Sequence, residues 1–269
     1  MIEKYAIQLE ALYLEKNRRC YVHPDPLEFL YQYPEPADSE VAGFVAASLA
    51  YGNVFTILKS VKRVLDIMGP HPDFYLRKAD FADFMLDFSG FVHRFAKTEQ
   101  LAGMLSGMKS VATMKGSLME YFRKSCSSCD ASYVNALQEL SLAIRSGASS
   151  DPGHLVPAVE KKSACKRLNL YLRWMIRKDD VDPGTWHALC PSKLIVPLDV
   201  HMHRTSLDLG LTKRRQAGMK TALEITKAFS QIVPEDPVRY DFVLTRSGIR
   251  KDDTFSLQGF ASAPRKLKI

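Results

Sequence analysis

The chain has 269 residues, of which 46% are hydrophobic and 25% charged, with a formal net charge of +7 at pH 7. This composition is ordinary for a globular protein. No apolar run approaches the length of a membrane helix, and the N-terminal residues do not form a signal peptide. We therefore expect a cytoplasmic protein with no membrane contact.

Apolar side chains recur at helical spacing through most of the chain. A helical pattern covers residues 39–68, with Asp38 as a candidate N-cap and a turn at Tyr51-Gly52-Asn53. Shorter stripes at 101–108 and 134–144 precede a loop at 145–158. The remaining expected helices run over 163–177, 199–209, 219–232 and 237–246. No alternation is long enough for a sheet, so the sequence predicts an all-α fold.

The five cysteines do not form a convincing metal or disulfide pattern. An odd number of cysteines without a secretion signal favours reduced thiols. Cys126 and Cys129 have the spacing of a zinc knuckle, but no second pair follows them. We therefore expect no metal and no cofactor.

Positive charge is concentrated in one region of the sequence. Residues 161–227 carry 14 Lys and Arg against 6 Asp and Glu, which exceeds the net charge of the whole chain. A basic region of this kind favours a polyanionic partner such as DNA, whereas the alternative is a solvated basic face without a partner.

The helix expected at 163–177 places polar side chains on one face, at spacings of three and four residues. They are Lys166, Asn169, Arg173 and Arg177. One interpretation is an amphipathic helix whose polar stripe faces water. The other is catalytic, because a lysine in an enclosed site can act as an amine nucleophile.

A second feature is the segment Pro197-Leu198-Asp199-Val200-His201, which continues to Arg204 and ends at Leu209-Gly210. Asp199 stands at the start of an expected helix, where free N–H groups and the helix dipole hold a carboxylate in one orientation. The residue could be a helix cap, or a carboxylate directed into a cleft.

The Asp199 segment resembles the catalytic aspartate segment of the helix-hairpin-helix DNA glycosylases, the superfamily of endonuclease III-like enzymes. The run Lys-Arg-Leu-Asn-x-x-x-Arg-Trp at 166–174 resembles the lysine helix of archaeal-type 8-oxoguanine glycosylases. The chain as a whole resembles a family of uncharacterised conserved microbial proteins, with Ala-Tyr-Gly at 50–52 and Tyr-Asp-Phe at 240–242 as further hallmarks. A Gly-x-Gly hairpin turn before Lys166 and iron–sulfur cysteines are absent.

The resemblance implies two helical lobes with a cleft between them. The first lobe would span 38–190 and carry the lysine helix. The second would combine 1–37 with 191–250 and carry the aspartate helix, and 251–269 would form a basic tail. The implied activity is that of a monomeric DNA glycosylase with AP lyase activity, which excises a damaged base such as an oxidised purine from duplex DNA.

The same resemblance implies roles for individual residues. Lys166 would form a Schiff base with the sugar, and Asp199 would assist cleavage of the base–sugar bond. Four residues would line or support the base pocket: Tyr51, Asn169, Trp174 and His201. Six would contact DNA phosphates: Arg173, Arg177, Arg204, Lys213, Arg214 and Arg215.

Three alternatives remain open from the sequence. Lys193, six residues before Asp199, is a competing nucleophile. The chain could bind nucleic acid without catalysing a reaction. It could also be a metal-dependent hydrolase, since Asp199, His201 and His203 stand at alternate positions, although this spacing suits a strand better than a helix.

Overall fold

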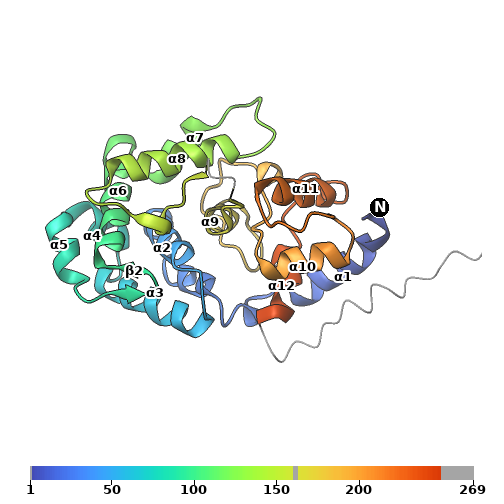
Figure 1. Ribbon diagram of the computed structural model, residues 1–269, viewed down its shortest axis with the longest axis horizontal. Helices are drawn as coiled ribbons and strands as arrows, with labels where there is room; N and C mark the ends of the chain where they lie inside the picture. Colours follow the sequence, from blue (N-terminus) through green and yellow to red (C-terminus); the bar gives the residue numbers. More distant parts are fainter. Residues whose placement is uncertain (1, 160–162, 250–269) are drawn as a thin grey trace, which may run out of the picture.

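The computed structural model describes residues 2–159 and 163–249. The described part is mostly helical, as the sequence predicts (Figure 1). The α-helices are α1 (Ala6–Lys16), α2 (Pro36–Ser48), α3 (Val54–Met68), α4 (Pro72–Lys78), α5 (Phe81–Asp87), α6 (Thr98–Lys115), α7 (Leu118–Ser125), α8 (Val134–Gly147), α9 (Lys166–Ile176), α10 (Val200–Asp208), α11 (Met219–Phe229) and α12 (Asp241–Ile249). Short 3₁₀ turns are η1 (Glu3–Tyr5), η2 (Arg19–Tyr21), η3 (Pro26–Gln32), η4 (Gly153–Leu155) and η6 (Pro191–Lys193).

The expected helices and the turn between the first two are confirmed, with shifts at their ends. Helix α2 begins at Pro36, where the fixed φ of proline suits the first helical turn, so the prediction of Asp38 as its N-cap is wrong. Asp38 lies inside α2, where it accepts hydrogen bonds from Asp73 N and His71 Nδ1. Asn53 caps α3 instead, by accepting from the N–H groups of Phe55 and Thr56.

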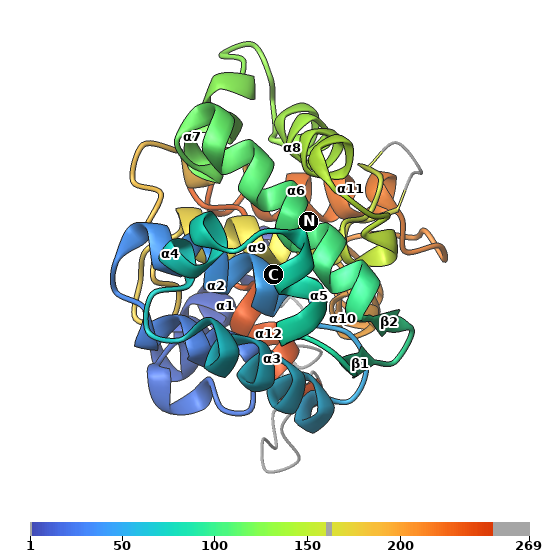
Figure 2. The same cartoon turned by 90° about the vertical axis from the view of Figure 1, so that its left-hand side faces the viewer.

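One small β-hairpin is present that the sequence does not predict. Strands β1 (Val92–His93) and β2 (Ala96–Lys97) pair antiparallel and lie beside α3 (Figure 2). Two residues per strand are too few to show the alternation by which a strand is recognised in a sequence. Tyr51 fixes the hairpin, because its hydroxyl donates to His93 O and the two rings meet edge to face.

Helix α9 lies at the centre of the molecule, with α2–α8 on one side and α1, α10, α11 and α12 on the other (Figure 1). It is buried from Leu168 to Ile176 and packs against α2. The division into two lobes stays a prediction. Within the segment 1–37, α1 contacts α12, whereas η3 packs against α2. The tail at 251–269 lies outside the described residues.

None of the helices in the described part of the chain combines the length and the apolar character needed to cross a bilayer.

Candidate active site

A cavity of about 440 Å³ opens where α9 meets its neighbours. Its walls come from five segments: the start of η3, the turn between α2 and α3 together with the beginning of α3, one side of α9, the N-terminus of α10 and the first half of α12. The lining residues are Pro24, Asp25, Pro26, Ala50, Tyr51, Gly52, Val54, Ile57, Lys166, Leu170, Arg173, Pro197, Asp199, Val200, His201, Asp241, Phe242 and Thr245. We call this cavity the central pocket.

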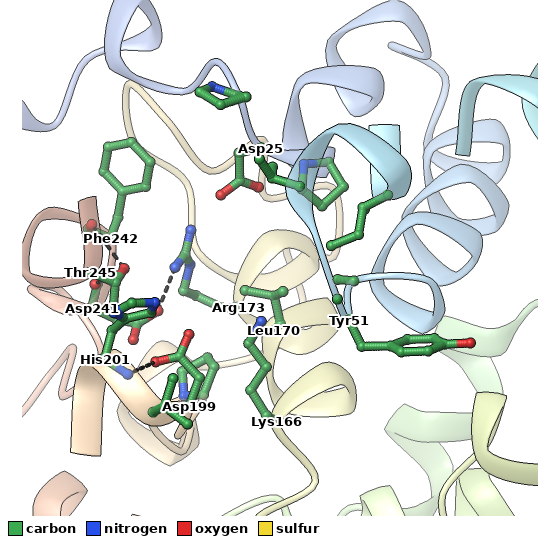
Figure 3. A pocket seen from close by; sticks show the side chains of 18 residues that line it. Asp25, Tyr51, Lys166, Leu170, Arg173, Asp199, His201, Asp241, Phe242 and Thr245 are labelled. Atoms are coloured by element: carbon green, nitrogen blue, oxygen red, sulfur yellow. Dashed lines mark hydrogen bonds and ion pairs between the residues drawn. The ribbon is translucent and has the colours of Figure 1, made fainter. Parts of the chain in front are cut away.

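Lys166 is the first residue of α9, and its side chain reaches along the wall of the central pocket (Figure 3). The turn before it is held by a hydrogen bond from Cys165 N to Ser163 Oγ, and Cys165 adopts a left-handed conformation with φ of 46°. Within residues 2–159 and 163–249, Lys166 Nζ has no hydrogen-bond or ion-pair partner. A half-buried amine without a protein partner is available to a bound molecule.

Asp199 is the N-cap of α10, as the sequence predicts. Its Oδ1 accepts hydrogen bonds from His201 N and Met202 N, each at 2.9 Å. The buried residues Pro197 and Leu198 anchor the chain before it. The backbone bonds fix the carboxylate, while Oδ2 keeps its hydrogen-bonding capacity for a ligand in the pocket. Asp199 and Lys166 face the same hollow from two different helices (Figure 3).

A chain of buried charges forms the inner wall of the central pocket. Arg173, three per cent exposed, donates from Nη1 to Asp241 Oδ2 at 2.5 Å and from Nη2 to Asp182 Oδ1 at 3.0 Å. The pKa of Asp241 is raised to about 6: burial is the largest cause, Arg173 and Lys166 oppose it, and the charge of Asp199 adds to it. Asp241 therefore titrates closer to neutral pH than an ordinary aspartate.

The predicted polar face of α9 exists, but it does not face water. Arg177 is also three per cent exposed, and its guanidinium is paired with Asp179, Asp182 and Asp236. Both Arg173 and Arg177 are thus paired with carboxylates, and Arg173 also lines the central pocket. Their expected role as phosphate contacts stays a prediction, but neither lies on the exposed surface, which a helical wheel alone does not reveal.

The four residues expected in the base pocket are placed differently. Tyr51 and His201 line the central pocket. The Tyr51 hydroxyl points away from the pocket centre and is within 2.7 Å of His154 Nε2 (Figure 3). Asn169 is buried and donates to Ala164 O, so it supports the turn before α9. Trp174 is fully buried in the core and does not line the pocket, so only the supporting part of its expected role stays a prediction.

The other expected phosphate contacts lie on the surface. Arg204, Lys213, Arg214 and Arg215 are exposed, and none of them lines the central pocket. Arg214 forms an ion pair with Glu224, and Arg214 and Arg215 line a second cavity of about 730 Å³ beside the start of α11. Their exposure is compatible with a contact to a polyanion.

The competing candidates receive less support from the geometry. Lys193 Nζ donates to the carbonyl groups of Ser127 and Ser128, and Lys193 does not line the central pocket. His203 Nε2 hydrogen-bonds Arg214 O. Within the described part of the chain, no three His, Cys, Asp or Glu residues are grouped so that they could hold a metal ion.

Sequence reasoning missed the opposite wall of the central pocket. Asp25 accepts from Leu27 N and, through Oδ2, from Arg246 of α12 at 3.1 Å. Phe242 and Thr245 complete this wall. Asp241 and Phe242 belong to a hallmark of the resemblance, but nothing in the sequence indicated their role. Asp25 gave no signal, because its place depends on a contact between segments more than 200 residues apart.

The chain belongs to a family of proteins of unknown function, DUF2400, whose model matches residues 25–250. The matched range covers every residue that lines the central pocket except Pro24. Neither a search of curated proteins nor a search of solved structures finds a match to the chain.

Proposed function

We propose that this protein is a DNA glycosylase with AP lyase activity, of the helix-hairpin-helix kind, and that it excises a damaged base from duplex DNA. One observation carries the proposal. Lys166, an amine without a partner among the described residues, and Asp199, a carboxylate held by two backbone N–H groups, line the same pocket. The chemistry needs no cofactor. A cytoplasmic location and action as a monomer are part of the same proposal.

The lysine would act on the deoxyribose. A flipped nucleotide enters the central pocket, since the base–sugar bond cannot be reached inside the stacked duplex. The base leaves first, with the electron pair of the C1′–N bond, and the unprotonated Lys166 amine then bonds to C1′. Opening of the sugar ring then yields an iminium between Nζ and C1′. Loss of a C2′ proton with breakage of the C3′–O bond cuts the strand.

Asp199 would stabilise the positive charge that develops on the sugar during base loss. Preorganised charges of this kind lower the barrier most effectively where water is excluded. The two backbone hydrogen bonds keep Oδ1 in place, so the carboxylate does not need to reorganise during the reaction.

The DNA backbone would be bound by the exposed basic residues. Arg204, Lys213, Arg214 and Arg215 supply positive charge within the basic region 161–227. Contacts to phosphates give affinity without sequence preference, and this suits an enzyme that searches DNA for lesions. The buried Arg173 and Arg177 are not part of this surface.

Borohydride trapping tests the proposal. Hydride reduces the iminium to a stable amine, which leaves the protein covalently linked to DNA. We expect adducts with duplexes that carry an abasic site or 8-oxoguanine, with uracil as a third substrate. Lys166→Gln is expected to abolish the adduct, whereas the matched control Lys193→Gln should retain it.

Absence of any adduct over this panel would remove the lyase activity. If the protein still bound duplex DNA in a salt-dependent manner, unchanged by Lys166→Gln, it would be a nucleic-acid-binding protein without catalysis. An adduct that survived Lys166→Gln would assign the nucleophile to another lysine.

A further inference from the structure

The central pocket contains a second carboxyl group that the proposed lysine chemistry does not use. Asp241 is three per cent exposed, and its Oδ1 has no hydrogen-bond partner in the described part of the chain. A buried polar atom without a partner is rare in a folded protein, because it loses its hydrogen bonds to water. Because Asp241 lines the central pocket, a group that enters the pocket is a candidate partner for Oδ1.

The rest of the Asp241 side chain is held firmly. Oδ2 accepts from Arg173 Nη1 at 2.5 Å (Figure 3). Arg173 is itself fixed by the fully buried Asp182. When Asp241 is protonated, the carboxylic acid therefore carries its proton on Oδ1, the oxygen without a protein partner in the described part of the chain. This arrangement presents one proton donor at a fixed position in the wall of the pocket.

The proposed excision has a need that this donor could meet. Lys166 supplies the nucleophile and Asp199 supports the sugar, but a departing purine carries away an electron pair and is a poor leaving group unless it is protonated. We propose that Asp241 is the general acid of the site, which protonates the departing base through Oδ1. This inference rests on the function proposed above.

The step balances without a further reactant. The C1′–N bond breaks, its electron pair passes into the base, and the base takes the Oδ1 proton and leaves as a neutral molecule. After the base has left, the nitrogen of Lys166 forms the new bond to C1′. The resulting secondary ammonium then returns one proton to the Asp241 carboxylate, which restores the acid.

The charges around Asp241 set the pH range of this role. Arg173 and Lys166 face it from α9, and Asp199 faces it from α10. His201 also lines the pocket.

From the opposite wall come Asp25 and its partner Arg246, the latter on the same helix as Asp241. Burial is the largest influence and raises the pKa of Asp241 to about 6. A general acid works best when its pKa lies near the operating pH. Base release is therefore expected to slow as the pH rises above about 6.

The test compares two reactions of the same variant. Asp241→Asn keeps an oxygen for Arg173 but cannot transfer a proton. We expect it to slow the single-turnover release of 8-oxoguanine by about 100-fold or more, the range typical of a lost general acid. Borohydride trapping on an abasic duplex, where no base has to leave, should stay within about three-fold of wild type, which also reports that the variant is folded.

The matched control is Asp182→Asn, which also removes a carboxylate from Arg173 but lies outside the pocket. In Asp182→Asn, the rate of base release should still fall above about pH 6. In Asp241→Asn, this dependence on pH should be absent. If Asp241→Asn does not fold, the wild type decides: base release must fall with rising pH while abasic trapping does not.

Each remaining outcome overturns one of the two proposals. Equal losses of base release and abasic trapping, or an unchanged rate of base release in Asp241→Asn, would contradict the acid role. The acid role would also be contradicted if the wild-type protein were trapped on an abasic duplex but released no base. No trapping and no base release by the wild type would instead overturn the proposed function.

Discussion

The two ends of helix α9 carry cations on the same face, yet their surroundings differ completely. At the first residue, Lys166 has no hydrogen-bond or ion-pair partner among the described residues and lines a pocket. Two and three turns later, Arg173 and Arg177 are buried among carboxylates. The comparison shows that charge and helical spacing do not define a role. Other segments supply carboxylates to Arg173 and Arg177, which therefore hold the structure together, whereas none of the described residues pairs with Lys166.

Loss of a buried cation at the C-terminal end of α9 should strongly destabilise the protein. Arg177→Met would leave Asp179 and Asp236 without this counter-charge, and it would leave Asp182, which is fully buried, with Arg173 alone. We expect the free energy of unfolding to fall by about 3–5 kcal/mol. Chemical denaturation measures this loss. Lys166→Met is the control and should stay within about 0.5 kcal/mol of wild type. Equal losses would remove the contrast between the two ends.

A second buried carboxyl group, Glu40 of α2, should make stability depend on pH. Burial raises its pKa to about 7, although it accepts from Leu118 N, Met119 N and Trp186 Nε1. Because the folded pKa lies above the unfolded value of 4.5, this group adds stability below about pH 4.5 and loses it as the pH rises towards 7.

The expected change from Glu40 is on the order of 3 kcal/mol. Denaturation at a series of pH values measures it, and Glu40→Gln should flatten the dependence between about pH 5 and 7. The raised pKa of Asp241 acts in the same direction at lower pH. An unchanged slope in the variant would show that Glu40 does not titrate in this range.

The cap of α10 should contribute less to stability. Asp199→Ala removes the acceptor for His201 N and Met202 N, and this should cost about 1 kcal/mol. Asp199→Asn keeps a cap but loses the charge, so it should retain most of the stability while slowing base release. If both variants released base at the wild-type rate, Asp199 would be a cap and nothing more.

The smallest effect on stability is expected on the basic surface. Arg215→Ala removes an exposed side chain, so the free energy of unfolding should change by no more than about 0.5 kcal/mol. The salt dependence of duplex binding should instead decrease by about one unit in slope for each lost phosphate contact. Binding measured over a range of salt concentrations tests this. An unchanged slope would place the DNA elsewhere.

Local sequence signals predicted the helices and the cap well. Apolar spacing located α2, α3, α6 and α8–α12, and Asp199 was correctly identified as an N-cap, because these features depend on neighbours within one or two turns. The burial of Arg173 and Arg177 could not be predicted in the same way. It depends on Asp182 in the loop after α9, on Asp236 in the loop before α12 and on Asp241 at the start of α12, and no local pattern shows that these three carboxylates meet α9.

The candidate site follows the same division. Lys166 and Asp199 could be named from their motifs, and the structure lines one pocket with both. Asp25 and the role of Asp241 emerge only when η3 and α12 close the pocket. The core position of Trp174 could not be distinguished from a pocket position, because the sequence beside an arginine is compatible with both.

The most direct test of the account locates the covalent bond. Wild-type protein is trapped with borohydride on an abasic duplex, digested with a protease, and the peptide that carries the sugar remnant is identified by mass spectrometry. The account predicts a single modified lysine, Lys166. Modification of Lys193 or of another lysine, or the absence of any modified peptide, would contradict it.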